Sequence, residues 1–157
     1  MSAERPGVVA PSAIERVVNR AFGLLVRLGL GLRHNYLLQV RGRKTGRVRS
    51  TPVNVLEHGG RRWLVAGRGR TEWVRNAEFA GEVVLRRGWR RERCRLRLVP
   101  NAEKPEVLSA YLGRFRLTVQ RYFPVRAGAP PAELVPFVDR YPVFEVRNAA
   151  PSPVRSG

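Results

Sequence analysis

Three strand-like runs separated by glycine-containing turns fill residues 36–67, and they constrain the fold more than any other feature of the chain. The runs are YLLQVR, VRSTPVNVLEH and RRWLVAG, and the turns between them are GRKTGR and Gly59-Gly60. Short apolar or alternating runs bounded by turn residues are typical of β-strands. Because the connections are short, we predict that consecutive strands pair in antiparallel fashion.

The rest of the chain adds further strands and helices to this group. Residues 81–99 hold two more strand-like runs joined near Gly88, and residues 142–147 hold a last one. Helical spacing and end signals predict helices at 71–81 and 101–115 and a weaker one at 131–141. Five or six antiparallel strands with helices between them do not suit a parallel α/β sheet. We therefore predict a mainly β (α+β) fold, a small barrel or strongly curled sheet with peripheral helices.

The N-terminal region contains an amphipathic basic helix over residues 12–28, which begins with the capping box SAIE. In one interpretation this helix packs on the domain core, and in the other it lies on an anionic membrane surface. Residues 1–11 and 149–157 are poor in apolar side chains and are predicted to be flexible tails. A single domain over residues 12–148 follows.

No segment of the sequence looks like a membrane span or a signal peptide. Arg or Gly interrupts every apolar stretch, and the N-terminus lacks an apolar core followed by a cleavage site. The expected location is the cytoplasm, with peripheral membrane contact through residues 12–28 kept as an alternative. The lone Cys94 excludes an internal disulfide and is predicted to point inward as an apolar filler.

Basic residues outnumber acidic ones by 30 to 12, which gives a formal net charge of +18. Such an excess attracts anions, whether nucleic acid, a phosphorylated cofactor or lipid headgroups. Arginines at alternate positions from Arg91 to Arg97 would line one face of a strand, so a nucleic-acid-binding protein is one reading. That reading is disfavoured because no nucleic-acid-binding motif accompanies the stripe, which is explained more simply as the outer face of a barrel strand.

The sequence contains almost no side chains arranged to catalyse a reaction without a cofactor. His34 and His58 are far apart and have no spacing typical of a metal site. The acids form no evident carboxylate pair, and Ser50 and Ser109 lack the GxSxG context of a hydrolase. An enzyme with this sequence would have to take its reactive atoms from a cofactor, so no metal is expected.

The GRKTGR turn is the strongest candidate for binding such a cofactor. Gly42 and Gly46 permit positive φ, so the backbone between them can turn tightly and aim N–H groups outward. Arg43 supplies a planar fork for phosphate, Lys44 a point charge and Thr45 a hydroxyl donor. The residues predict a phosphate clamp at a hairpin tip, and the alternative is a solvated hairpin.

The turn and the segments around it also resemble the sequence pattern of a known protein family. The stretch GRKTGRVRSTPV, preceded by YLLQVR and followed by WLVAGRG and WVRN, resembles the deazaflavin-dependent nitroreductase family, whose members are split β-barrel oxidoreductases that use coenzyme F420. The resemblance spans roughly residues 36 to 146. It implies a split β-barrel of about six antiparallel strands. It also implies an enzyme that transfers a hydride from reduced F420 to a small electrophile such as a quinone, a nitro compound or an activated alkene.

The resemblance further implies site residues. The turn residues contact the phosphate of the coenzyme, the two following strands lie along its ring, and the next loop and helix cover it. In this order, the implied cofactor-binding residues are Arg43, Lys44, Thr45, Pro52, Asn54, Val65, Ala66, Gly67, Arg68, Gly69, Trp73 and Asn76. Tyr111 and Tyr122 are the candidates on the substrate side. The stretch AGRGRTEW departs from the family pattern, because it is shorter and has arginines in place of a Gly-Gly pair and a Pro.

Other ligands and assemblies stay open at this stage. Split barrels also bind FMN or haem, and some act as carriers without turnover, so FMN is the alternative cofactor. The sequence is equally compatible with a monomer and with a homodimer.

Overall fold

The computed structural model describes residues 16, 20 and 34–149. The helix predicted for residues 12–28 lies outside these residues, apart from Arg16 and Arg20, which are helical. The tails predicted for 1–11 and 149–157 also lie outside them, apart from Ala149, so the predicted domain boundaries stay predictions.

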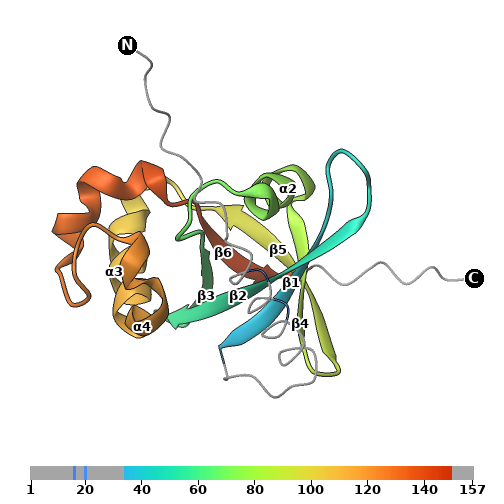
Figure 1. The fold of residues 1–157 in the computed structure, drawn as a ribbon, viewed down its shortest axis with the longest axis horizontal. Helices are drawn as coiled ribbons and strands as arrows, with labels where there is room; N and C mark the ends of the chain where they lie inside the picture. The colour runs from blue at the N-terminus through green and yellow to red at the C-terminus, as the bar shows by residue number, and fades with distance from the viewer. Residues whose placement is uncertain (1–15, 17–19, 21–33, 150–157) are drawn as a thin grey trace, which may run out of the picture.

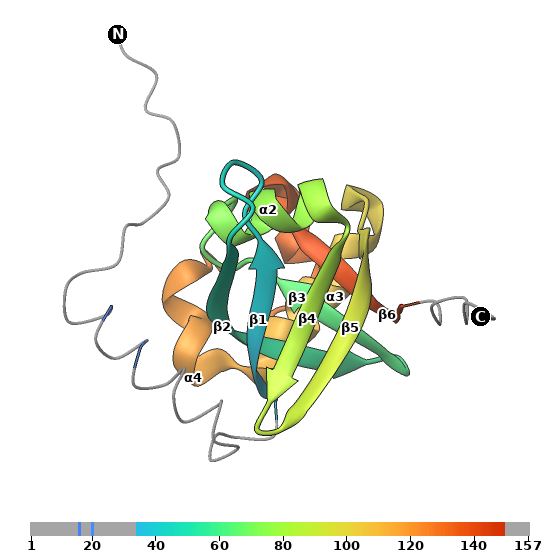
Figure 2. The ribbon, with the colours of Figure 1, turned by 90° about the vertical axis from the view of Figure 1, so that its right-hand side faces the viewer.

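Six antiparallel strands close into a barrel, as the sequence predicted (Figures 1 and 2). The order around the barrel is β1-β2-β3-β6-β5-β4, so β1 pairs with both β2 and β4. The strands are β1 (Asn35–Arg41), β2 (Val48–His58), β3 (Arg61–Val65), β4 (Glu82–Arg87), β5 (Arg90–Leu98) and β6 (Val143–Asn148). Closure removes the free sheet edges that an open arrangement would expose, and it confirms the mainly β fold.

Helices lie at 71–81, 101–115 and 131–141 as the sequence predicted, and two further short ones over residues 116–122 were not predicted. They are α2 (Glu72–Ala80), η1 (Asn101–Glu103), α3 (Lys104–Arg114), α4 (Arg116–Val119), η2 (Gln120–Tyr122) and η3 (Pro131–Arg140). The last of these is a 3₁₀-helix and contains Pro136, which has no N–H to donate to a helical ladder. Among the residues that the structure describes, no helix has both the length and the apolar character needed to cross a bilayer.

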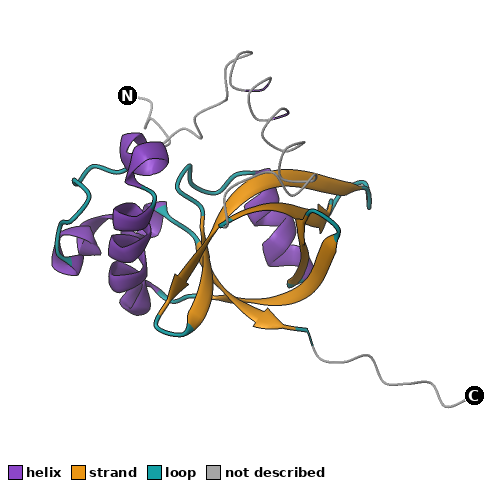
Figure 3. Ribbon diagram, turned by 90° about the horizontal axis from the view of Figure 1, so that it is seen from below, coloured by secondary structure: helices purple, strands orange, loops and turns teal. Residues whose placement is uncertain are grey.

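Strand β3 separates two apolar cores because its side chains alternate between its two faces. Leu64 points into the barrel, where it joins Leu38, Phe144 and the fully buried Cys94. Trp63 and Val65 point outward and pack against side chains of α3 and η3. The helical layer therefore lies on one side of the barrel, as Figure 3 shows. The inward orientation predicted for Cys94 is confirmed.

Helix α2 closes one end of the barrel (Figure 3). Val74 and Ala77 are fully buried and belong to the barrel core, and the Trp73 ring lies 6.0 Å from the ring of Phe144. The helix ends at Gly81, whose φ of 68° places it in the left-handed conformation predicted for a C-terminal cap. Thr71 occupies the N-cap position, but its side chain makes no capping hydrogen bond.

The arginine stripe on β5 lies on the outside of the barrel. Arg91, Arg93 and Arg95 are exposed, as both sequence interpretations require. Arg97 is partly covered and pairs with the buried Glu145 of β6 at 2.6 Å. Part of the stripe therefore ties neighbouring strands together.

We predict that Phe144→Ala destabilises the barrel by about 3 to 5 kcal/mol, because it removes a fully buried ring that α2 also packs against. Urea denaturation would measure the loss. Leu117→Ala is the control, because Leu117 is 94% exposed and its truncation should change stability by less than about 0.5 kcal/mol. Equal effects of the two substitutions would contradict the assignment of Phe144 to the core.

Candidate functional site

The turn between β1 and β2 is tight, and its two glycines serve different purposes. Gly46 adopts a φ of 71° and its N–H donates to the Gly42 carbonyl at 2.9 Å. Gly42 does not have a positive φ. A Cβ at Gly42 would lie 3.1 Å from Thr45 Oγ1 and 3.2 Å from the Arg47 carbonyl oxygen, so a side chain there would force these neighbours to shift. The predicted positive φ is therefore correct for Gly46 and wrong for Gly42, where the constraint is space.

Arg43 in this turn is bound to helix α2. The Asn76 Oδ1 atom accepts from the Arg43 backbone N–H at 3.1 Å and from its Nη1 at 2.8 Å. The same Nη1 lies 2.9 Å from the Glu72 carboxylate, and this contact lowers the pKa of Glu72. Asn76 is only 2% exposed, so its amide serves to fix the turn against the helix.

The other two turn residues are more open to solvent. Lys44 and Thr45 are both exposed. Thr45 Oγ1 accepts from the Arg47 N–H at 3.3 Å, and because a hydroxyl has one donor and two acceptor sites, its own O–H can still donate to a ligand. The apex of the turn thus presents a cation and a hydroxyl beside the fixed Arg43.

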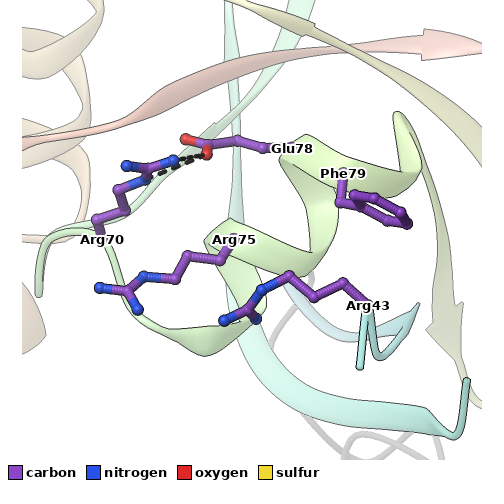
Figure 4. Close-up of a pocket in the computed structure, with 5 residues that line it drawn as sticks. All are labelled: Arg43, Arg70, Arg75, Glu78 and Phe79. Atoms are coloured by element: carbon purple, nitrogen blue, oxygen red, sulfur yellow. Dashed lines mark hydrogen bonds and ion pairs between the residues drawn. The ribbon is translucent and has the colours of Figure 1, made fainter. Parts of the chain in front are cut away.

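A shallow, largely open cavity of about 520 Å³ lies beside the turn and α2. Its lining residues are Arg43, Arg70, Arg75, Glu78 and Phe79 (Figure 4). The guanidinium groups of Arg43 and Arg75 extend in the same direction from their two elements. Arg70 bonds to Glu78, with its Nε 3.1 Å from the carboxylate oxygen. Cations therefore outnumber acids around this cavity.

Sequence reasoning missed Arg70 and Arg75 as members of this group. Arg70 belongs to the stretch AGRGRTEW, in which Arg68 was named as a cofactor-binding residue but Arg70 was noted only as a departure from the family pattern. Arg75 lies three residues after Glu72 on α2, so helical spacing could have placed it on the same side of the helix. These two arginines could not be assigned to the cavity because the sequence does not show the path of the chain between β3 and α2.

A second group forms where the end of β3 meets the helical layer. A Cβ at Gly67 would lie 3.8 Å from Phe123 Cε2, 3.9 Å from Tyr122 Cδ2 and 4.0 Å from Tyr111 Cε1. The Asn54 side chain of β2 lies close enough to the Tyr111 phenol to lower its pKa. Asn54, Gly67 and the two tyrosines, predicted from separate parts of the sequence, therefore lie together.

Burial governs the chemistry of Tyr111, which is 5% exposed. Burial raises the pKa of Tyr111 to about 12, the nearby Asn54 side chain opposes this rise, and Tyr122 adds to it. The phenol is therefore neutral at physiological pH and remains a hydrogen-bond donor. Tyr122 is half-buried, and its hydroxyl accepts from Arg121 Nη2 at 2.6 Å.

The side chains of several other predicted site residues pack in the protein interior or against a neighbouring strand. Val65 belongs to the core under the helices, while Ala66 and the half-buried Trp73 pack with the barrel core. Val65 and Ala66 can therefore meet a ligand mainly through their backbone. Pro52 is half-buried and pairs with Leu37 across β1 and β2.

The loop from β3 to α2 contains the last predicted residues. Arg68 is half-buried. Gly69 has a φ of 87°, a conformation that favours glycine, and its N–H donates to the Ala66 carbonyl at 3.0 Å. Within residues 34–149 and at 16 and 20, no group of His, Cys, Asp and Glu side chains could bind a metal ion.

Comparison of the sequence with known families gives one match. Residues 16–122 match the model of the family described as F420H(2)-dependent quinone reductase. The matched segment includes the β1–β2 turn, helix α2 and both tyrosines of the second group. No curated protein matches the chain significantly.

Solved structures show the same fold at low sequence identity. A protein of unknown function from Agrobacterium tumefaciens is 16% identical, with a TM-score of 0.54; the match covers 91% of this chain and 58% of that one. The haem storage protein HutZ from Vibrio cholerae is 12% identical, with a TM-score of 0.51 and coverage of 76% and 84%. The F420-H2 dependent reductase FDR-A is 19% identical, with a TM-score of 0.49 and coverage of 73% and 95%. The first two matches, with TM-scores above 0.5, show a likeness of fold alone at these identities.

We predict that the stability of the protein falls by about 2 to 3 kcal/mol between pH 10 and pH 12 through Tyr111 alone. In this window Tyr111 ionises in the unfolded chain but not in the folded one, because its folded pKa is raised from 10.0 to about 12. Below pH 10 this contribution is fully present. Urea denaturation at the two ends of the window would measure the loss.

Tyr111→Phe should remove this part of the alkaline destabilisation. Tyr36→Phe, at a half-buried position of β1, retains Tyr111 and should keep the wild-type slope. An unchanged slope in Tyr111→Phe would mean that this phenol is not buried as described.

Proposed function

The chain belongs to the F420H(2)-dependent quinone reductase family, and from this membership we propose that it transfers a hydride from reduced coenzyme F420 to a small quinone. The protein is an F420-dependent reductase, and coenzyme F420 is its cofactor. The nature of the acceptor and the role of each residue belong to the proposal.

The cavity beside α2 suits the acidic tail of the coenzyme, which carries a phosphate followed by glutamates. Arg43, Lys44 and the Thr45 hydroxyl would hold the phosphate, and Arg70 and Arg75 extend the positive surface along the cavity. Glu72 occupies one side of Arg43 in the described structure. This exposed pair is weak, so a phosphate of higher charge can replace the carboxylate.

One observation carries the proposal for the reacting end of the site. The family resemblance places Gly67 along the deazaflavin, and a Cβ built on it would lie within about 4 Å of Tyr111 and Tyr122, the two tyrosines that the resemblance places on the substrate side. Because Gly67 has no side chain, its backbone is left uncovered beside Tyr111 and Tyr122 and can meet the coenzyme there. Asn54 adds a polar group from β2 at the same place.

The roles of these residues follow from their protonation and burial. When bound, the reduced coenzyme supplies the hydride. Tyr111, with a pKa near 12, keeps its proton and acts as a hydrogen-bond donor that orients an acceptor oxygen. Phe123 and the buried Tyr141 provide apolar walls that exclude water from this region. Tyr122 lies nearer to solvent than Tyr111, and an acceptor would enter the site past its side chain.

The choice of acceptor can be tested directly. Under anaerobic conditions the protein and reduced F420 are mixed with menadione, a nitroaromatic compound or an activated alkene, and the return of oxidised-coenzyme absorbance is followed. We expect the quinone to react with a kcat/KM at least about tenfold above the other acceptors. Equal rates, or faster reduction of the nitro compound, would contradict the quinone assignment while leaving the coenzyme assignment intact.

We predict that Arg43→Ala combined with Lys44→Ala weakens F420 binding by about 2 to 5 kcal/mol, because two charge-assisted contacts to the phosphate are lost. Coenzyme fluorescence titration measures the affinity. The charge-matched control is Arg116→Ala with Arg126→Ala, two exposed positions of the helical layer that should leave affinity within about twofold. An unchanged affinity in the first variant would remove the turn from the coenzyme site.

A further inference from the structure

A tryptophan stands at the apex of the β4–β5 hairpin and is 95% exposed. Gly88 and Trp89 form a two-residue turn between the paired residues Arg87 and Arg90. Gly88 has a φ of 58° and Trp89 has a negative φ, which fits a type II′ hairpin turn. The turn requires a glycine at its first position, but nothing in its geometry requires an aromatic residue at its second.

The other large side chains exposed on the described surface do not combine these features. Single exposed apolar residues are common, and Leu117, at 94% exposed, is one of them. Trp89 differs because it projects from the tip of a two-stranded hairpin. Four arginines also flank it in the sequence RRGWRR of residues 86–91.

No acid lies within this arginine-rich apex, and the nearest one is already bound. Glu92 accepts two bonds from Arg62, at 2.8 Å and 2.5 Å. The Arg86 Nε donates to the Gly88 carbonyl at 3.5 Å and steadies the turn, while Arg90 and Arg91 are exposed. The apex therefore combines a positive charge with one large amphipathic ring.

The apex lies at the end of the barrel opposite α2 (Figure 2). Strand β4 begins directly after Gly81, the cap of α2, and runs away from the helix to Arg87. Six residues of strand span roughly 20 Å, so the apex is well separated from the cavity beside α2. A surface that contacts the apex would leave that cavity open.

We propose that residues 86–91 dock the protein on an anionic lipid bilayer, with the Trp89 ring in the interfacial layer and the surrounding arginines on lipid headgroups. Tryptophan partitions to the membrane–water interface because its ring is apolar and its N–H can still bond with water and headgroups. Basic residues beside it are attracted to the negative surface potential of anionic lipids.

A convex hairpin apex suits a bilayer better than a nucleic acid. Proteins that bind single strands use a positively charged groove along which several aromatic rings stack on successive bases. Trp89 offers one ring, at a tip instead of in a groove, and this arrangement favours insertion into a surface. The interaction is independent of the proposed quinone acceptor.

The test uses the full chain and vesicles of phosphatidylcholine, with or without phosphatidylglycerol, in a sedimentation assay. We expect binding to the anionic vesicles only, weakened about tenfold or more by Trp89→Ala and about 25-fold by Arg90→Ala with Arg91→Ala. The matched controls are Leu117→Ala for the exposed apolar side chain and Arg116→Ala with Arg126→Ala for the charge. Neither control should change the partition by more than about twofold.

Brominated lipids give a second readout that does not depend on affinity. They should quench part of the tryptophan emission of the wild type, and Trp89→Phe should abolish that part, since Trp63 is buried and Trp73 is half-buried at the opposite end of the barrel. Vesicle binding that survives Trp89→Ala at full strength would overturn the proposal. Loss of binding to a single-stranded oligonucleotide in Trp89→Ala, with no vesicle binding by the wild type, would also overturn it and identify nucleic acid as the partner.

Discussion

Strand β3 is the constraint on which the rest of this structure depends, because it belongs to two cores at once. Its inward side chains complete the barrel, and its outward side chains Trp63 and Val65 hold the helical layer. As β3 ends, the chain emerges between the two cores at Gly67, where Tyr111 and Tyr122 of the helical layer meet it. The same strand leads through one loop to α2, so both halves of the candidate site follow from its position.

The buried amide of Asn76 extends this organisation to the charged turn. A hairpin tip carrying several cations would ordinarily be solvated and mobile, since its charges repel one another. Here Asn76 accepts from both the backbone and the side chain of Arg43, and Glu72 pairs with the same guanidinium group. A buried amide that satisfies two donors is costly to break. The turn is therefore held in place before any anion arrives, which lowers the ordering cost of binding.

The strands and the main helices could be predicted from sequence because their signals are local. Alternation, glycine turns and helical spacing are read within ten residues or so, and they placed β1 to β5, α2 and α3 correctly. The two uses of glycine in the β1–β2 turn could not be separated, because a steric requirement at Gly42 depends on where Thr45 and Arg47 fold back. The cavity arginines and the Asn54–Tyr111 contact depend on strand order, which the spacing of residues does not reveal.

The distribution of acidic residues determines which of the many cations are paired and which remain exposed. Six glutamates of the described chain form ion pairs with arginines: Glu72, Glu78, Glu82, Glu92, Glu103 and Glu145. Most of these pairs join different strands, or a strand to a helix, so the scarce acids serve mainly to position the chain. The exposed cations beyond this need include those at the β1–β2 turn and at the β4–β5 apex, which lie on opposite ends of the barrel. A net charge that attracted anions everywhere would not discriminate between ligands. Here the shape of each surface separates the ligands. The cavity beside α2 suits a small polyanion, and the protruding ring at the β4–β5 apex suits an extended surface.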